Sequence, residues 1–338
     1  MGAFIIRRFL WMLLVLFGVS VVTFVLMHGV PGGPFDGEKK LPPEILANIN
    51  KKYNLNDPLV IQYLTYMGNI VVPRIYQGEL TASQTSDYLI DIPLNENTHF
   101  QWMNFGPSYK SKSRSVNDIF RDQLPVSAQL GIVALLLALC IGIPLGMVAA
   151  LRRNSRFDYL SMSVAILGVS VPSIVLGPIL VWQFGVNKSF GIQLPVTGWG
   201  TPAHFIMPAF ALGFASSALF ARLTRASLLE VLNEDYIRTA RAKGLSERTV
   251  LNVHALKNAL IPVVTVIGPL FAALVTGTFV VEKIFGIPGM GKYFIDSIGN
   301  RDYPVIMGTT LLYASLLVIA NLFVDLAYAW LDPRIRYS

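Results

Sequence analysis

The chain has 338 residues, of which 53% are hydrophobic and only 14% charged. A soluble protein of this length would form two or three domains, but this composition argues against a soluble protein. The net charge of +7 is not accompanied by any RNA- or DNA-binding motif, so we do not interpret it as a nucleic-acid surface.

Six apolar stretches follow one another along the chain, and no Asp, Glu, Lys or Arg falls in the middle of any of them. They cover residues 9–28, 124–151, 159–184, 205–221, 260–281 and 304–330. Each is close in length to the ~20 residues that a helix needs to cross the hydrocarbon core of a membrane. The sequence predicts an all-α polytopic membrane protein with six transmembrane helices, the first retained rather than cleaved as a signal peptide.

The distribution of Lys and Arg predicts the orientation of these helices. With a cytoplasmic N-terminus, the basic residues that fall inside are Arg7, Arg8, Arg152, Arg153, Arg156, Arg222, Arg225, Arg238, Arg241, Lys243, Arg248, Lys257, Arg334 and Arg336. The short outer loops hold only Lys188, Lys283, Lys292 and Arg301. Because basic residues favour the cytoplasmic side, we expect both termini inside and the segment 31–122 outside.

The outer segment has two parts. Two short amphipathic helices, separated at residues 54–58, are predicted for the run LPPEILANINKKYNLNDPLVIQYLTYM. Pro suits a first helical turn, and the Asn-Asp-Pro cluster breaks a helix. Residues 72–115 are polar and aromatic, and we expect them to be irregular. A connection of that length is either a functional loop or a variable insertion.

Small and polar residues within the spans have two interpretations. Gly142-x-x-x-Gly146 is spaced for close helix packing, which we expect within the subunit, with a contact between subunits as the alternative. Six hydroxyl residues could line a pathway or could equally be packing contacts: Ser170, Ser173, Ser216, Ser217, Thr276 and Thr278. Cys140 lies inside a span and has no partner for an internal disulfide.

Motifs for catalysis or ion coupling are incomplete. The run from Gly286 to Tyr293, GIPGMGKY, approaches a phosphate-binding loop but has Tyr where Ser or Thr must bind Mg²⁺, so we expect a tight turn that leads into a short helix, KYFIDSIGN. The four histidines, His28, His99, His204 and His254, lie at span ends or in loops. Asp325, one turn from Asn321, lies near a span end, as do Glu282 and Lys283, and we expect Asp325 to have a structural hydrogen-bond role.

A compact charged stretch lies between the fourth and fifth spans. Residues 228–242 are strong helix formers, with apolar positions at 228, 229, 232, 236 and 237. Gly244 is a candidate helix C-cap and Ser246 a candidate N-cap for a second helix through Val250 and Leu251. The pattern predicts two helices that meet at a glycine corner, with an ordinary solvated loop as the alternative.

At these residues the sequence resembles a known family. The run DYIRTARAKGLSERTVLNVHALKNALIPV resembles the cytoplasmic coupling loop, the EAA motif, of ABC importer permeases in the oligopeptide/dipeptide permease B family. Similar pieces occur in order along nearly the whole chain: IIRRFL, PGGPF, LPPE, YNLNDP, FGPSYK, SVNDI, LPVSAQLG, GIPGMG, NRDYP and DPRIRY. Arg238 and Lys257 stand where the general motif has Glu and Pro, and residues 72–100 have no counterpart in compact members.

The resemblance implies a type I ABC importer permease fold with four parts. These are the cytoplasmic N-terminus and first helix (1–30), an extracytoplasmic segment (31–122), a transmembrane domain (123–330) with its coupling loop at 229–258, and a cytoplasmic tail (331–338). It also implies that a group of loop residues contacts an ATPase: Asp235, Tyr236, Arg238, Ala240, Ala242, Lys243, Gly244, Leu245, Ser246 and His254. The mixed charge signs of the loop suit a protein partner better than lipid headgroups, which would favour basic residues alone.

The function that the resemblance implies is import across the plasma membrane of a bacterial type. The chain would form half of the pathway for oligopeptides or dipeptides, beside a second permease, two cytoplasmic ATPases and an extracytoplasmic solute-binding protein. It would bind no cofactor itself and would not be an enzyme, because ATP and Mg²⁺ are used by the partner ATPases. Nickel chelates and oligosaccharides are alternative cargoes, and a stand-alone channel or a membrane-bound enzyme are alternatives from other classes.

Overall fold

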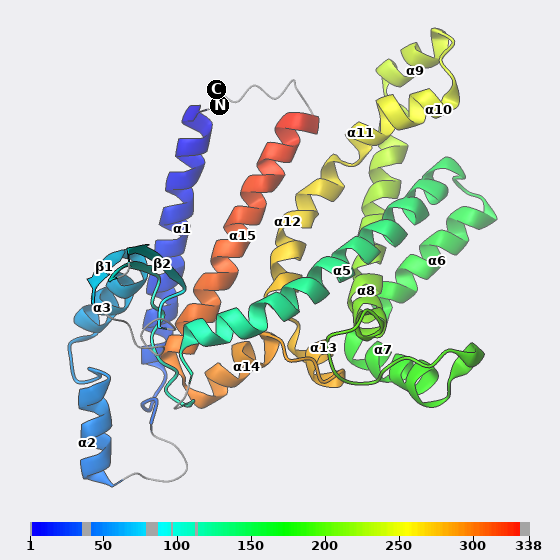
Figure 1. Ribbon diagram of the computed structural model, residues 1–338. Coiled ribbons are helices and arrows are strands. Elements are labelled where there is room, and N and C mark those ends of the chain that lie inside the picture. Colours follow the sequence, from blue (N-terminus) through cyan, green and yellow to red (C-terminus); the bar gives the residue numbers. More distant parts are fainter. Residues whose placement is uncertain (1, 36–41, 79–86, 96, 112–113, 332–338) are drawn as a thin grey trace. The chain divides into compact units, whose positions relative to one another are not determined.

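The computed structural model describes residues 2–35, 42–78, 87–95, 97–111 and 114–331. The predicted tail at 331–338 lies outside this range except for its first residue. The chain divides into two compact units, which we describe separately. Unit 1 comprises Met1–Met12, Val126–Gly289 and Ser315–Ser338, and unit 2 comprises Leu13–Pro125 and Met290–Ala314. Helices α1 (Gly2–Gly29), α5 (Val116–Leu151) and α15 (Tyr303–Leu331) contribute to both (Figure 1).

Most of the predicted spans are confirmed. Within the described residues, five helices are long and apolar enough to cross a membrane: α1, α5, α8 (Ala203–Val231), the α12–α13 pair (Ile261–Val275 and Phe279–Ile284) and α15. The helical, multi-pass architecture that the sequence predicts is therefore present.

The span predicted at 159–184 is not one straight helix. It consists of α6 (Arg156–Ser170) and α7 (Ser173–Leu180), which continues as the π-helix η1 (Val181–Val186), and the two halves are bent by 100°. The bend falls at Val171-Pro172, where Val171 is extended. A residue before proline disfavours the helical conformation, and proline cannot donate a backbone hydrogen bond, so the break has a local cause. The described part of the chain has six spans if this bent pair counts as one.

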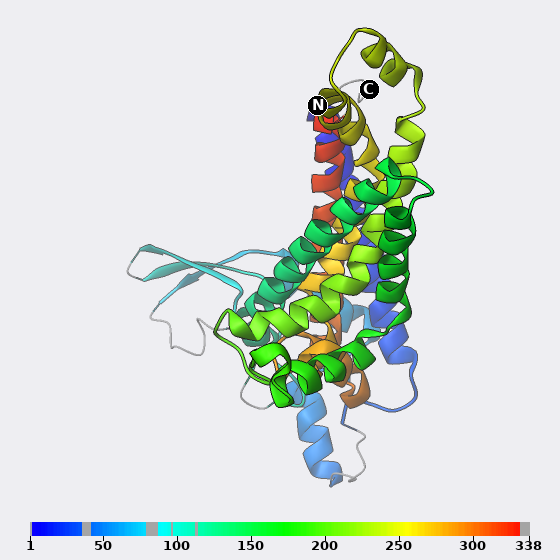
Figure 2. The same ribbon diagram turned by 90° about the vertical axis from the view of Figure 1, so that its right-hand side faces the viewer.

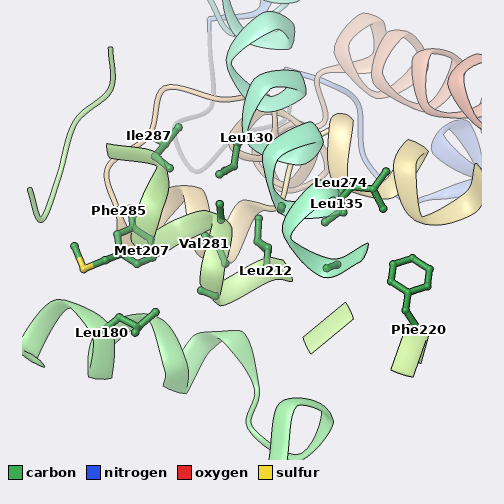
Figure 3. Close-up of a cluster of buried hydrophobic side chains, with 14 of the residues drawn as sticks. Leu130, Leu135, Leu180, Met207, Leu212, Phe220, Leu274, Val281, Phe285 and Ile287 are labelled. Carbon is green, nitrogen blue, oxygen red and sulfur yellow. The ribbon is translucent and has the colours of Figure 1, made fainter. Parts of the chain in front are cut away.

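The core of unit 1 is formed by facing side chains of α5, α7, α8, α12 and α13. Figure 3 shows members of this cluster, including Leu130 and Leu135 of α5, Met207 and Leu212 of α8, and Leu274 of α12. The cluster is continuous, so the broken third span and the fifth span are packed into the same core.

Glycines set the distance between α5 and α8. A Cβ atom at Gly142 would lie 2.5 Å from the backbone oxygen of Ser217, and one at Gly146 would lie 2.5 Å from that of Ala221. Only glycine permits so close an approach. The prediction that this pair packs within the subunit is confirmed.

Unit 2 has its own core, in which Phe24 of α1 and Ile70 meet Phe120 of α5 and Met307 of α15. The two predicted outer helices are present as α2 (Pro43–Lys52) and α3 (Leu59–Val71), with a break between them as expected. The short helix after the glycine-rich turn is α14 (Gly291–Asn300).

The expectation that residues 72–115 are irregular is wrong. They contain a three-stranded antiparallel sheet of order β1-β3-β2, formed by β1 (Arg74–Gln77), β2 (Ile90–Asn95) and β3 (Thr98–Trp102). Ile75 and Ile92 both pair with Phe100 of the central strand. Strands this short carry little local signal, and Pro93 within β2 argues against a strand by composition alone.

Candidate functional site

The charged stretch between α8 and α12 folds as a chain of short helices, which we call the 232–260 segment. α8 ends at Val231, and after a turn come α9 (Asp235–Ala242), α10 (Glu247–Thr249), the π-helix η3 (Val250–Ala255) and α11 (Leu256–Ala259). Figures 1 and 2 both show α9 and α10 beyond the end of α8 (Figure 2). The segment therefore extends past the spans of its own unit.

The continuous helix predicted for 228–242 is interrupted. Asn233 Nδ2 donates a hydrogen bond of 2.8 Å to the carbonyl oxygen of Leu229, which satisfies a carbonyl left free at the end of α8. Glu234 is extended and serves as the N-cap position of α9. Propensity favours helix through this region, but the side-chain bond to the backbone stops it.

The glycine corner is present as predicted. Gly244 has a φ of +77°, its N–H donates to the carbonyl of Arg241 at 2.9 Å, and the N–H of Leu245 donates to the carbonyl of Ala240 at 3.4 Å. This pair of bonds is the Schellman pattern that ends a helix with a left-handed residue. Ser246 Oγ then accepts from the N–H of Thr249, which confirms the predicted N-cap.

The underside of the 232–260 segment is a small buried core. Ile237 and Ala240 of α9 and Val250 of η3 pack with Leu228 of α8 and Ala150 of α5, and all five are buried. Ala240, which the resemblance places among the contact residues, thus packs inward. Sequence reasoning assigned no role to the rest of this core, although the i, i+3 spacing of Ile237 and Ala240 could have indicated it.

The outer face carries charges of both signs. Arg241 donates to Glu247 through Nε at 2.9 Å and Nη2 at 3.3 Å, so this pair spans the corner. Arg238 donates to Asp235 at 3.2 Å, and Asn258 donates to the hydroxyl of Tyr236 at 2.7 Å.

The remaining sequence-predicted residues of this loop are dispersed over its surface. His254 is half-buried in η3, whereas the others are exposed: Asp235, Tyr236, Arg238, Ala242, Lys243, Gly244, Leu245 and Ser246. Exposed apolar side chains lie among these charges, such as Leu245 and Val253. A surface that mixes charged and apolar side chains can bind another protein. Within the described residues, no group of three His, Cys, Asp or Glu side chains is placed to hold a metal.

An ion pair between a partly exposed arginine and a buried aspartate lies close to this segment within unit 1. Arg225 donates to Asp158 through Nε and Nη2, both at 2.8 Å, and the N–H of Asn154 donates to the same carboxylate at 2.9 Å. The Asp158 side chain is only 4% exposed. The pair joins the start of α6 to α8 within two turns of the end of α8. Sequence reasoning treated Arg225 only as a topological charge and missed the pair, because its partners are far apart in the chain.

The glycine-rich turn that resembles a phosphate loop follows helix α13 rather than a strand. Glu282, only 3% exposed, accepts hydrogen bonds from Ser127 Oγ at 2.7 Å and from the N–H of Thr278 at 3.2 Å. A Cβ atom at Gly289 would lie 2.4 Å from this carboxyl group. Glu282 therefore joins α13 to α5, and Gly289 leaves room for its carboxyl group.

In unit 2, the segments FGPSYK and NRDYP meet at the buried carboxylate of Asp302. Asp302 of NRDYP accepts hydrogen bonds from the hydroxyl of Ser108, from the N–H of Tyr109 at 3.0 Å and from the N–H of Lys110 at 3.3 Å, all of them in FGPSYK. Burial, together with the nearby Asp302 carboxylate, raises the pKa of Tyr109 well above its usual value. These contacts hold the loop before α5 against the start of α15.

Polar side chains in the spans mostly bond to their own helices. The hydroxyls of Ser216, Ser217 and Thr276 donate to backbone oxygens three or four residues earlier. Asp325 accepts from Arg8 Nη2 at 2.8 Å, which confirms the structural role expected for it.

The fold and these contacts define a multi-pass, helical membrane protein. Residues 142–337 match the model of the family described as "Binding-protein-dependent transport system inner membrane component", and residues 1–131 match that of its N-terminal region. The chain belongs to this family and is a transport permease of an ABC transporter.

Two relatives are similar over almost their whole length. The dipeptide transport system permease protein DppB of Bacillus subtilis (strain 168) is 44% identical over 99% of this chain and 98% of its own. The oligopeptide transport system permease protein OppB of Salmonella typhimurium is 42% identical over 99% of both. Among solved structures, a chain of the inward-facing MetNI methionine ABC transporter matches with a TM-score of 0.51 and 17% identity, over 63% of this chain and 96% of that one. That likeness shows the fold alone, the type I fold of ABC importer permeases.

Proposed function

We propose that this chain is the permease subunit of an ATP-driven importer and forms half of the translocation pathway for dipeptides or oligopeptides. The observation that carries the proposal is the near full-length likeness to two peptide permeases. Transport proteins that share one fold can carry different cargoes. We therefore infer the cargo from these relatives rather than from the fold.

The 232–260 segment is the proposed coupling site. Its exposed face combines Arg238, Lys243 and Glu247 with the apolar side chain of Leu245, and such a mixture suits a specific protein groove. Its buried face is fixed to α5 and α8 through Ile237 and Val250. A displacement of the docked ATPase is therefore passed to the spans without unfolding the segment. The chain transmits the motion, and hydrolysis of ATP with Mg²⁺ takes place in the partner subunits.

The proposed assembly contains a homologous second permease, two cytoplasmic ATPases and an extracytoplasmic solute-binding protein in the plasma membrane. Both chain termini and the 232–260 segment would face the cytoplasm, because this orientation places most of the basic residues inside. To test the orientation, single cysteines are introduced in a Cys140→Ser background and treated with an impermeant thiol reagent. Cysteine at Ser155 or Ser246 should react only from the cytoplasm and cysteine at Glu44 only from outside. Labelling of Ser246→Cys and Glu44→Cys from the same side would refute this topology.

The cargo is tested with the assembled complex in lipid nanodiscs. Solute-binding proteins loaded with a dipeptide, an oligopeptide, a nickel chelate or an oligosaccharide are added separately, and ATP hydrolysis is measured. Stimulation by a peptide-loaded protein alone supports the proposal. Stimulation only by the nickel or sugar form would assign the chain another cargo, and cargo flux through liposomes that contain this chain alone would identify a channel.

A further inference from the structure

Helix α3 has an apolar surface that the described residues of its unit do not cover. Its sequence, LVIQYLTYMGNIV, contains no Asp, Glu, Lys or Arg over 13 residues. Val60 is 68% exposed, Leu64 61% and Leu59 53%, and Val60 and Leu64 are one turn apart on the same face. A helix in water would place polar side chains at such positions.

Contacts within unit 2 place α3 beside the membrane-spanning part of α1. The hydroxyls of Tyr63 and Ser20 are 2.7 Å apart, and the rings of Tyr63 and Phe24 meet edge to face at 5.3 Å. Ser20 lies past the middle of the span Ile6–Gly29, roughly 13 Å from its end at 1.5 Å per residue. The hydrocarbon core is about 30 Å thick, so a side chain that reaches Ser20 lies well inside it.

Two polar side chains of α3, those of Gln62 and Tyr66, have hydrogen-bond partners within unit 2. Gln62 Nε2 donates to the carbonyl oxygens of Leu55 at 3.0 Å and Asp57 at 2.8 Å. The Tyr66 hydroxyl donates to the carbonyl oxygen of Pro304 at 3.4 Å. Such internal partners lower the cost of placing these side chains in an apolar environment.

A groove of about 400 Å³ runs between α1 and α3. Residues that line it include Val21, Val25, Leu59, Val60 and Tyr63. This surface continues into the exposed face of α1 at Val22 and Leu26, and α1 is apolar and long enough to span a membrane.

We propose that α3 is inserted into the bilayer beside the C-terminal half of α1, and that lipid acyl chains cover its exposed face and fill the groove. At 13 residues, α3 is roughly 20 Å long and cannot cross the core, so it enters and leaves on one side. The segment between the first two spans is thus divided, with α2 and its lysines in water and α3 in lipid.

The test uses the assembled complex in nanodiscs, in a Cys140→Ser background. Spin labels are attached to Val60→Cys and Leu64→Cys, with Val22→Cys on α1 as the lipid control and Lys51→Cys on α2 as the water control. Collisions with oxygen, which concentrates in lipid, and with water-soluble chromium oxalate are measured. Labels at 60 and 64 should match the label at 22, with frequent oxygen collisions and loss of the chromium collisions seen at 51.

Two outcomes would overturn the proposal. Chromium collisions at 60 and 64 equal to those at 51 would place α3 in water, and low collision rates with both reagents would mean that another chain covers it. A maleimide assay separates the same cases. Leu64→Cys should be unreactive in the bilayer and reactive in the complex after transfer to detergent, whereas a cysteine that a partner covers stays unreactive in both.

Discussion

Gly244→Val is expected to uncouple transport from ATP hydrolysis while leaving the protein inserted. At Gly244 the φ of +77° requires a left-handed backbone, which costs an L-residue about 1–2 kcal/mol, and a β-branched residue lies at the upper end. Among the described residues other than its two chain neighbours, no atom lies within 4 Å of a Cβ built at this position. The expected cost therefore comes from the backbone conformation and not from a collision. A penalty of this size lowers the population of the native corner roughly 5–30-fold relative to alternatives.

The interactions that oppose this loss are weak. The Arg241–Glu247 pair that spans the corner is exposed to solvent, and exposed pairs contribute about 0–1 kcal/mol. The spans themselves should survive, because their backbone hydrogen bonds are internal. We therefore expect α9 to change its orientation relative to α10 without a loss of membrane insertion.

The assay compares uptake and ATP hydrolysis by the reconstituted complex for Gly244→Val, Gly244→Ala and Gly244→Asn. Asparagine tolerates the left-handed region better than other residues, so Gly244→Asn should retain most of its transport. Gly244→Val should lose uptake far beyond any loss of expression, and its ATPase activity should be absent or insensitive to the loaded binding protein. Normal uptake by a well-expressed Gly244→Val complex would show that coupling does not need this corner.

Three further predictions concern other parts of the chain. Gly146→Ala should force α5 away from α8 and destabilise the purified complex by about 1–3 kcal/mol, measured as a lower thermal midpoint. Gly18→Ala is the control and should not lower the midpoint, because a Cβ at Gly18 meets no atom of the described residues within 4 Å. Asp158→Asn should destabilise the complex by about 1.5–3 kcal/mol because it weakens the charge-assisted hydrogen bonds from Arg225. Asp235→Asn on the surface should leave the midpoint unchanged. Replacement of residues 74–101 by a Gly/Ser linker should weaken docking of the solute-binding protein, measured by its dissociation constant, and should leave basal ATPase activity intact. Loss of complex assembly would instead assign the sheet a structural role.

Features with a local cause could be predicted from the sequence. The spans follow from long uncharged runs, and the corner follows from Gly244 and Ser246, because a left-handed residue and a side-chain cap each depend on only a few neighbouring positions. The bend between α6 and α7 also has a local signal in Val171-Pro172, but the apolar run that continues through it concealed the break.

Features formed by distant residues could not be predicted in this way. The Asp158–Arg225 pair joins residues 67 positions apart, and nothing near either residue indicates the other. In the sheet, β3 lies between β1 and β2, so the strand order depends on the path of the chain and not on composition. The insertion proposed for α3 likewise depends on a contact between Tyr63 and Ser20, 43 positions away.

The turn between α13 and α14 shows why a sequence can imitate a nucleotide-binding motif without sharing its chemistry. In a phosphate loop, glycines leave room for the anionic oxygens of a ligand to approach the backbone. At Gly289 the space beside the backbone is occupied by the carboxyl group of Glu282, which belongs to the protein itself. The absence of a side chain at this glycine therefore makes room for carboxyl oxygens of the same chain. Gly289→Ala would displace this carboxyl group, and a search by pattern alone would mistake the site for one that binds a ligand.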